Sequence, residues 1–248
     1  MITATTRLVA LLRHPLAESL SPRMQNAAFA ARALDWAYFA CGVEPADLAA
    51  AVAGLRALGF AGANVTMPHK TAVAALCDDL DDVARRSGAV NTLLFSERRA
   101  ITGANTDGPA VAGSVEAAGA SVLVLGRGGA ARSAAVALED AGAASVRLAS
   151  RRDEDWPPKA DDVTILVNAT PLRDEVPVAP LPHHQVVDFA YRPDGRPTAL
   201  VEAAHAAGCR RVVDGREILV RQGAASFQLW TGVPAPLDVM HAAIARIV

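Results

Sequence analysis

The sequence predicts an α/β protein made of two units, each built around a largely parallel sheet. Short apolar runs alternate with longer amphipathic segments along the chain, which is the pattern of strands joined by crossover helices. A second series of such runs begins at Ser121, after the first is complete. The glycine-rich stretch Gly126 to Arg132 follows the first strand of that second series, as it does in dinucleotide-binding units.

Composition limits the possible classes of protein. The 248 residues are 52% hydrophobic and 20% charged, as in an ordinary globular protein with a sizeable core. A net charge of −2 gives no reason to expect nucleic acid or a membrane surface as partner. The three cysteines are far apart, no apolar run could span a bilayer, and the first residues lack a signal segment. We therefore expect a cytoplasmic protein without a metal site, a monomer or a homodimer.

The first unit should begin with the order strand, helix, strand, helix, strand. The expected strands are Arg7–Leu12, Trp36–Val43 and Gly59–Ala63, and the expected helices are Pro22–Leu34 and Pro45–Leu58. Two short helices should follow within residues 71–87, and then the strand 93–96, a hairpin tip at Arg98 and Arg99, and a return strand that ends near Gly103.

The second unit repeats the alternation of strands and helices. Its boundaries are expected at residues 107 and 218, so that the first unit comprises 1–106 and is completed by 219–248. The expected strands are 122–125, 145–149, 163–167, 186–191 and 211–213, the expected helices are 109–118, 130–141, 198–207 and 217–229, and a last helix, 237–248, should pack back on the first unit.

Two serines precede the first helix. Ser21 stands directly before Pro22, which is a good N-cap followed by proline at the first helical position. Ser19 has no such structural role in the sequence pattern. The pair is therefore a candidate for binding a small polar ligand.

The stretch Asn64 to Lys70 follows the third strand. Thr66 is placed to cap a helix that starts at Pro68, with Lys70 in its first turn. A cation is unfavourable there because the helix dipole is already positive. Lys70 therefore indicates a nearby anion, although this stretch alone fits an exposed surface lysine somewhat better.

Two further polar residues lie where strands end. Asn91 precedes the strand 93–96, and Asp107 follows the return strand. Each has a structural reading, Asn91 as a turn residue and Asp107 as a helix cap. Ligands of α/β proteins bind at the carboxyl ends of strands, so both are also candidate ligand-binding residues.

The pattern after Ser121 predicts a nucleotide site. The turn Gly126-x-Gly128-Gly129-Ala130 joins a strand to a helix, where glycines let the backbone approach phosphates and the helix supplies N–H donors. The next strand ends at Ser150-Arg151-Arg152, which suits a ribose 2′-phosphate. Asp153 follows but lies past the strand end, so NADP is preferred to NAD. Two solvated arginines are the alternative.

Taken together, several segments resemble the shikimate dehydrogenase family in order and spacing over nearly the whole chain. They are Ser19-Leu20-Ser21-Pro22, Asn64 to Lys70, Gly88 to Thr92, Asn105 to Gly108, Gly126 to Arg132, and Gln222-Gly223-Ala224 with Phe227, Trp230, Thr231 and Gly232.

The resemblance implies a substrate-binding domain, a Rossmann-like NADP-binding domain with a parallel sheet, and a cleft between them. It implies the interconversion of shikimate and 3-dehydroshikimate in chorismate and aromatic amino acid biosynthesis. Reduction of a ketone by hydride leaves an alkoxide, which needs a proton and a positive partner. Lys70 would supply both, with Asp107 orienting its ammonium.

The resemblance also implies which residues contact the ligands. Substrate-binding residues would be Ser19, Ser21, Thr66, Asn91, Asp107, Tyr191 and Gln222. Residues that hold NADP would be Gly126, Gly128, Gly129, Ala130, Ser150, Arg151, Arg152, Asn168, Thr170 and Gly215.

The chain departs from the family pattern at a few positions. Glu18 stands where the family usually has His, Arg13 where it has Gly, and Arg127 where it has a small residue. Arg173-Asp174 replaces a Gly-Met pair near the nicotinamide. We expect Glu18 to alter the binding of a carboxylate and Arg173-Asp174 to affect cofactor positioning. A quinate/shikimate or aminoshikimate dehydrogenase, an NAD-using enzyme and a non-catalytic NADP-binding regulatory protein remain alternatives.

Overall fold

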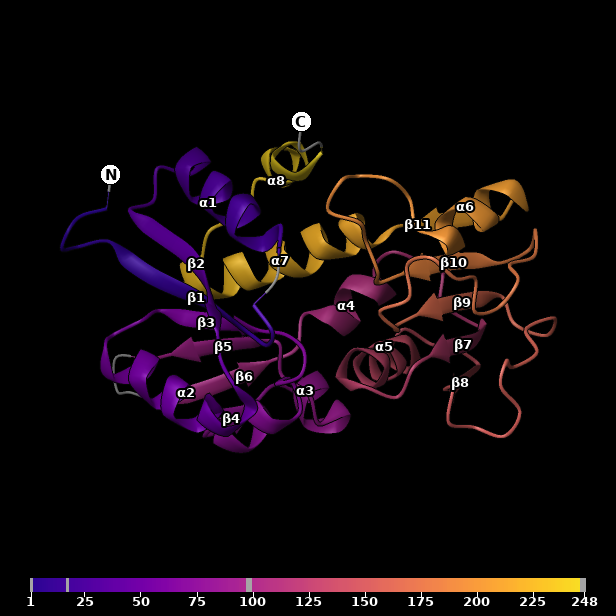
Figure 1. The fold of residues 1–248 in the computed structure, drawn as a ribbon, viewed down its shortest axis with the longest axis horizontal. Helices are drawn as coiled ribbons and strands as arrows, with labels where there is room; N and C mark the ends of the chain where they lie inside the picture. The colour runs from indigo at the N-terminus through magenta and orange to yellow at the C-terminus, as the bar shows by residue number, and fades with distance from the viewer. Residues whose placement is uncertain (1, 17, 97–99, 246–248) are drawn as a thin grey trace. The chain divides into compact units, whose positions relative to one another are not determined.

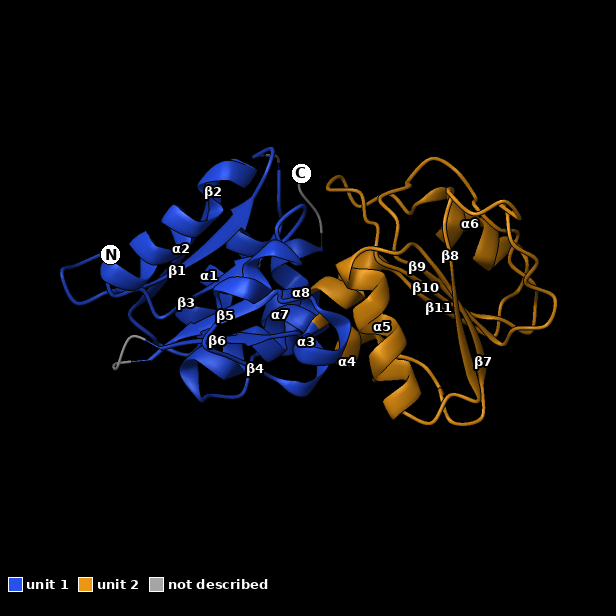
Figure 2. Ribbon diagram, turned by 90° about the horizontal axis from the view of Figure 1, so that it is seen from below, with its two compact units in different colours: residues 1–106, 220–246, 248 blue, residues 107–219, 247 orange. Residues whose placement is uncertain are grey.

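The computed structural model describes residues 2–16, 18–96 and 100–245; the expected hairpin tip at Arg98 and Arg99 lies outside them. The chain divides into two compact units (Figure 2). Unit 1 holds the residues up to Thr106 and those from Val220 onward, and unit 2 holds Asp107–Leu219. The first boundary lies where the sequence pattern put it, and the second falls one residue later, inside a helix. None of the helices in the described part of the chain combines the length and apolar character needed to cross a membrane.

Unit 1 contains a six-stranded mixed sheet of order β2-β1-β3-β5-β6-β4 (Figure 1). The first three strands are parallel, whereas β5 runs antiparallel to both β3 and β6. The strands are β1 (Arg7–Arg13), β2 (Trp36–Gly42), β3 (Gly62–Val65), β4 (Asp79–Leu80), β5 (Thr92–Phe95) and β6 (Ile101–Ala104).

Helices cover both faces of this sheet (Figure 1). One face packs its apolar side chains against α2 and α3. The other carries α1 and α7, whose Phe29 and Phe227 rings stack 5.3 Å apart, and α8 packs on α1 as expected. The bounds are α1 (Ser21–Ala31), α2 (Leu48–Ala57, after a 3₁₀ turn at Pro45–Asp47), α3 (Asp82–Ser87), α7 (Gly215–Thr231) and α8 (Leu237–Ile244).

The two-residue period of β3 separates an apolar face from a polar one. Ala63 and Val65 belong to the core beneath α2. Gly62 and Asn64 therefore point to the α7 face. A Cβ at Gly62 would lie 2.3 Å from the carbonyl oxygen of Leu93 and 2.4 Å from Nε1 of Trp230. Glycine is needed at this position because α7 approaches the sheet so closely.

Unit 2 is a doubly wound sheet of five parallel strands with order β11-β10-β9-β7-β8. One face packs against α4 and α5, and the other against α6. The chain order reverses direction between β7 and β9, the switch point where α/β sheets bind ligands. The elements are α4 (Asp107–Ala112), β7 (Ser121–Leu125), α5 (Gly129–Asp140), β8 (Ser145–Ala149), β9 (Ile165–Asn168), β10 (Gln185–Asp188), α6 (Ala199–Ala206) and β11 (Arg211–Val213).

The helix expected from Pro68 does not form, so that prediction was wrong. Residues 67–71 are a turn, and a 3₁₀ helix follows at Ala72–Leu76. The carbonyl of Lys70 accepts from the Val90 N–H at 2.8 Å, so it is bonded to another segment instead of to the next helical turn. Without a helix at Pro68 there is no helix dipole at Lys70, so the inference of a nearby anion from that dipole was wrong.

Candidate active site

A buried hydrogen-bond network lies on the α7 face of the unit 1 sheet. Asn64 of β3 is its centre. The Tyr38 hydroxyl donates to Asn64 Oδ1 at 2.9 Å, and Asn64 Nδ2 donates to the Asn91 carbonyl and to Ser226 Oγ, each at 3.1 Å. This single side chain thus links β2, the end of the segment before β5, and α7.

Asn91 extends the network toward the end of β6. Its Nδ2 donates to Thr106 Oγ1 at 2.9 Å and to Gln222 Oε1 at 3.5 Å. Its Oδ1 accepts from the Thr106 N–H at 2.9 Å and from Thr92 Oγ1 at 3.0 Å. The hydroxyls of Thr92 and Ser226 are 2.8 Å apart. Asn91 is therefore more than a turn residue, because its amide joins both ends of the β5–β6 hairpin to α7.

The network is neutral and almost closed to solvent. Hydrogen bonds of this kind gain strength in a low-dielectric interior, and their unpaired members become costly. The network also fixes the half-buried Gln222 beside the buried amide of Asn91. The buried members are Tyr38, Asn64, Asn91, Thr92, Thr106 and Ser226, and Gln222 is half-buried.

The structure corrects the roles expected for the two serines. Ser21 is the first residue of α1, and the N-cap position is taken by Leu20 without a side-chain bond. The Ser19 hydroxyl accepts from the Ser21 N–H at 3.3 Å. The capping role predicted for Ser21 was therefore wrong, and Ser19 does have a local structural partner. The serines stay close together through this bond, half-buried and buried respectively.

Thr66 and Lys70 flank a turn tied to three neighbouring segments. The Thr66 N–H donates to the Leu12 carbonyl at 3.0 Å. His69 is 1% exposed, and its Nε2 lies 2.9 Å from the Val43 carbonyl oxygen. Thr66 and Lys70 are both half-buried. The buried His69 therefore fixes the backbone from which Lys70 projects.

Asp107 directly follows Thr106, so the network anchors the backbone beside it. It is 4% exposed and is the first residue of α4. Two other predicted residues come later in the chain. Tyr191 lies three residues after β10 and is half-buried. A Cβ at Gly215, where α7 begins, would lie 2.3 Å from the carbonyl oxygen of Ala190, which gives this glycine a packing role.

The glycine-rich turn after β7 has the geometry of a phosphate cradle. Gly126 has φ of +120°, and a Cβ there would lie 3.2 Å from the carbonyl oxygen of Ala169. Gly128 is the N-cap of α5, with no atom within 4 Å of where a Cβ would lie. Gly129 and Ala130 open the helix, so their N–H groups are exposed to a ligand at the N-terminus. These residues fit a dinucleotide phosphate.

Two residues of the segment predicted to bind the 2′-phosphate, Ser150 to Arg152, contact carboxylates of the chain itself. Ser150 donates to Asp153 through its N–H and its hydroxyl, and Arg127 also pairs with Asp153. Arg151 pairs with Glu175. Arg152 is exposed. The structure thus brings Ser150 beside the Gly126–Arg132 turn through Asp153, which the sequence pattern had set aside, and through Arg127, which stands where the family usually has a small residue.

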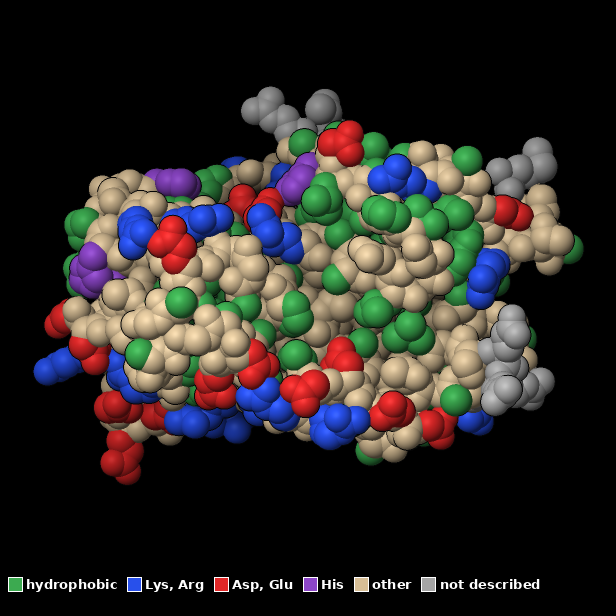
Figure 3. All heavy atoms as spheres, turned by 180° about the vertical axis from the view of Figure 1, so that it is seen from behind, with side chains coloured by type: hydrophobic (Ala, Val, Ile, Leu, Met, Phe, Trp, Pro, Cys, Tyr) green, Lys and Arg blue, Asp and Glu red, His purple; other side chains and the backbone are tan. Residues whose placement is uncertain are grey.

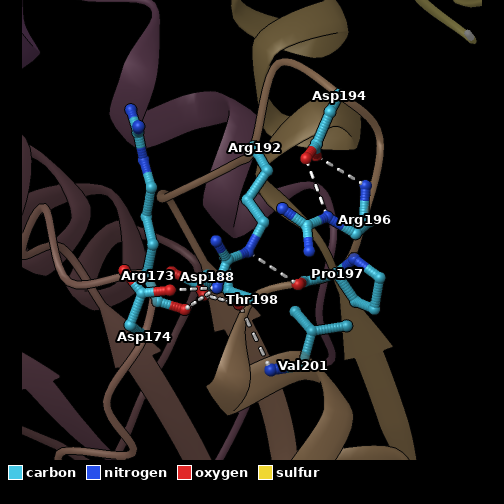
Figure 4. A network of polar contacts seen from close by, with 9 residues as sticks. All are labelled: Arg173, Asp174, Asp188, Arg192, Asp194, Arg196, Pro197, Thr198 and Val201. Atoms are coloured by element: carbon cyan, nitrogen blue, oxygen red, sulfur yellow. Dashed lines mark hydrogen bonds and ion pairs between the residues drawn. The ribbon is translucent and has the colours of Figure 1, made fainter.

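Asn168 and Thr170 occupy the end of β9 at the switch point. Asn168 is completely buried. Its Oδ1 accepts from Thr170 Oγ1 at 2.6 Å, and its Nδ2 donates to Asp188 Oδ1 at 2.9 Å. Asp188 also accepts from the Ala190 N–H and from the Thr198 hydroxyl (Figure 4 shows the latter). Burial raises the pKa of Asp188 from 3.8 to about 6, although these hydrogen bonds act in the opposite direction.

The Arg173-Asp174 departure belongs to the same region. Asp174 pairs with Arg192, whose guanidinium also bonds to the carbonyls of Arg173 and Pro197. Figure 4 shows the Arg173 side chain extending away from this pair. The Arg173 carbonyl also accepts from the Ala199 N–H at 2.8 Å. The Asp174 side chain therefore links the segment after β9 to the segment after β10.

On the face drawn in Figure 3, acidic and basic side chains lie next to one another at several places. Among the described residues no group of His, Cys, Asp and Glu could hold a metal ion. All three cysteines are free.

The doubly wound sheet and the glycine turn place the chain among α/β proteins with a Rossmann-like unit. Comparison with known proteins narrows this class. Residues 11–93 match the shikimate dehydrogenase substrate binding domain, and residues 215–245 match the shikimate 5'-dehydrogenase C-terminal domain.

Curated relatives match almost end to end. The chain is 42% identical to the NADP(+) shikimate dehydrogenase of Moorella thermoacetica, over 96% of this chain and 92% of that protein. It is 44% identical to that of an Anaeromyxobacter species, over 99% and 98%. The chain therefore belongs to the shikimate dehydrogenase family.

Solved structures agree with this membership. A shikimate dehydrogenase in complex with NADP+ superposes with a TM-score of 0.88 at 31% identity, covering 98% of this chain and 96% of the other. The Thermus thermophilus enzyme in complex with NADP(H) and shikimate gives 0.84 at 34% identity, covering 96% and 98%. A ligand-free 5-ketofructose reductase of Gluconobacter also gives 0.84, at 30% identity, covering 98% and 99%.

Proposed function

We propose that the chain is an NADP-dependent shikimate dehydrogenase that interconverts 3-dehydroshikimate and shikimate, a step of chorismate and aromatic amino acid biosynthesis. The buried network around Asn64 and Asn91 carries the proposal, because it holds Gln222 and the backbone before Asp107 in fixed positions. Relatives at 42% to 44% identity bear that enzyme name. The free cysteines fit a reducing cytoplasm, where the enzyme acts as a monomer or a homodimer.

The substrate is bound through neutral groups, most of which belong to unit 1. The hydroxyls of Ser19, Ser21 and Thr66 take the carboxylate and a neighbouring hydroxyl. Asn91 and Gln222 take ring hydroxyls, with Tyr191 as a further contact. Their orientation is set before binding, since the Asn91 amide is held on both sides. Such preorganisation lowers the entropy lost on binding.

Lys70 moves the proton of the reaction. In the oxidative direction its amine takes the proton from the reacting hydroxyl. In the reductive direction its ammonium gives a proton to the forming alkoxide and neutralises the charge there. Asp107 orients the ammonium. The nicotinamide, when bound, accepts or supplies the hydride.

The cofactor is held by unit 2. The N–H groups of Gly128, Gly129 and Ala130 bind the pyrophosphate, and Gly126 supplies the positive φ of the turn. Ser150, Arg151 and Arg152 take the 2′-phosphate. Asn168, Thr170 and Gly215 shape the region beside the nicotinamide through the contacts described above.

The test is the spectrophotometric reduction of NADP+ by the purified chain with shikimate, quinate and an aminoshikimate side by side. The proposal expects the highest kcat/KM with shikimate. A clear preference for quinate or the aminoshikimate would assign a paralogue with another ring alcohol, in which Glu18 alters the substrate subsite. No turnover with any of them, with NADP+ still bound, would favour a regulatory protein.

A further inference from the structure

The carboxylate of Asp153 folds back onto the end of β8. Its Oδ2 accepts from the Ser150 N–H at 2.8 Å, and its Oδ1 accepts from the Ser150 hydroxyl at 3.3 Å. Asp153 lies past the end of β8 in the sequence. The chain turns at residues 150–153 and brings its carboxylate back to Ser150, the first residue after the strand.

Arg127 binds both oxygens of the same carboxylate. Its Nη2 donates to Asp153 Oδ2 at 2.8 Å and its Nε donates to Oδ1 at 3.2 Å, which is a two-point charge-assisted contact. The Asp153 side chain is 22% exposed and that of Arg127 is 57% exposed. The hydrogen bonds from Arg127 and Ser150 hold the pKa of Asp153 below its ordinary value, so the carboxylate is charged at neutral pH.

These donors are the kind that a phosphate monoester uses. A backbone N–H, a hydroxyl and a guanidinium converge on one anion, and that anion is a carboxylate of the chain itself. Arg151 is likewise paired with a carboxylate, that of Glu175. A 2′-phosphate arriving here has to replace Asp153 on Ser150 and Arg127, and it meets a like charge beside it.

A ribose with a free 2′-hydroxyl, as in NAD, can donate to Asp153 instead of competing with it. A carboxylate at the end of this strand accepts from the 2′-hydroxyl in NAD-binding units. Each oxygen of Asp153 already accepts one bond from Ser150 and one from Arg127, which uses its lone pairs. A 2′-hydroxyl therefore has to replace only the long 3.3 Å contact from the Ser150 hydroxyl, and the bonds from Arg127 and from the Ser150 N–H stay in place. The same loop therefore carries arginines suited to a phosphate and an acid suited to a hydroxyl.

We propose that Asp153 is a specificity-determining residue that lets this site accept NAD alongside NADP by withholding Ser150 and Arg127 from the 2′-phosphate. The inference rests on the proposed function only in that the turn after β7 binds a dinucleotide. Arg127 then contributes to the discrimination between NADP and NAD, because Asp153 binds its guanidinium.

The test measures the dissociation constants of NADP+ and NAD+ by calorimetry at one ionic strength near 0.1 M. Asp153→Asn removes the charge, and Asp153→Ala also removes the acceptor from Ser150. In each variant NADP+ should bind about tenfold more tightly, with NAD+ unchanged or weaker. Glu154→Gln is the matched control, since Glu154 is an exposed acid on the same loop. It should shift both constants less than about twofold, the small effect expected of an exposed charge.

A double variant separates two effects of Asp153, the repulsion between its charge and the 2′-phosphate and its hydrogen bonds with Arg127. In Asp153→Asn combined with Arg127→Ala, most of the gain for NADP+ should disappear, because the released guanidinium is absent. If the ratio of the two constants stays within twofold of the wild-type ratio in both single variants, the proposal is overturned while the proposed function stands. If the wild type binds neither dinucleotide, both are overturned.

Discussion

The polar groups that we assign to the substrate in unit 1 differ in burial and in charge from those that we assign to the 2′-phosphate in unit 2. In unit 1, Asn64 and Asn91 are at most 7% exposed and are joined to their neighbours by neutral hydrogen bonds. In unit 2, the arginines of the Arg127–Asp153 and Arg151–Glu175 pairs are 57% and 54% exposed. Buried neutral networks are costly to break, whereas exposed ion pairs are weak and exchange readily. The comparison suggests fixed geometry for the substrate and exchangeable contacts for the cofactor.

The largest effect is expected at Lys70, the residue of unit 1 that we propose to transfer the proton. Lys70→Ala should lower kcat by about a hundredfold or more, because no other group at this turn transfers the proton. The dissociation constant of NADPH should hardly change, since unit 2 holds it. Lys159→Ala is the control, since Lys159 is exposed and is the only other lysine in the sequence. A normal turnover rate for Lys70→Ala would remove its assigned role.

The next largest effect tests the cost of breaking the buried network. Asn64→Leu removes the acceptor of the Tyr38 hydroxyl and one of the two donors to the Asn91 carbonyl, which keeps its bond from the Val65 N–H. The variant should have a free energy of unfolding lower by about 3 kcal/mol. Tyr38→Phe removes a single donor and should cost about 1 kcal/mol. Urea unfolding of both variants measures these values. Equal stability of Asn64→Leu and wild type would mean that the network does not hold unit 1 together.

The exposed side of the comparison is tested at the arginines. Replacing both Arg151 and Arg152 with alanine should weaken NADPH binding about tenfold and NADH binding far less, since only the former carries the 2′-phosphate. Fluorescence titration with each reduced cofactor measures the two constants. Similar losses for both would show that the arginines do not contact the phosphate.

A smaller effect depends on pH and comes from Asp188. Its pKa is raised to about 6, so the buried carboxyl favours its protonated form in the folded state. Its contribution to stability is complete below about pH 4 and is lost as the pH rises through 6. Relative to Asp188→Asn, the wild type should therefore gain about 1 kcal/mol of unfolding free energy between pH 7 and pH 5. Unfolding curves at both pH values measure this, and a constant difference would refute the raised pKa.

The smallest effect should come from breaking an exposed ion pair. Glu175→Gln removes the partner of Arg151 and should change the free energy of unfolding by less than about 0.5 kcal/mol. Asn64→Leu in the same urea series is the reference. If the two variants were equally destabilised, the contrast between the units would not hold.

Local sequence signals predicted most elements of the fold. The strands Ser145–Ala149 and Arg211–Val213 have the bounds expected for them, because each is a short run closed by turn residues. The helix at Pro68 failed because the Lys70 carbonyl bonds to Val90, a partner that no local pattern reveals. Motif order identified the family, whose membership the relatives confirm.

The candidate site was only partly predictable. Asn91 and Gln222 could be named from motifs, but their bond joins residues 131 positions apart. Ser226 entered the network only because α7 lies on the sheet over Gly62. Asp153 was missed because linear distance from a strand end does not show where a turn returns the side chain.

The contrast between the units is tested most directly by the salt dependence of binding. Dissociation constants for NADP+ and for shikimate are measured by calorimetry between about 0.05 and 0.5 M ionic strength, a range over which exposed charges become screened. NADP+ should weaken steeply with salt, because its phosphate exchanges with exposed ion pairs. Shikimate should weaken much less, because neutral, half-buried or buried groups hold it. Equal slopes for the two ligands would contradict the account.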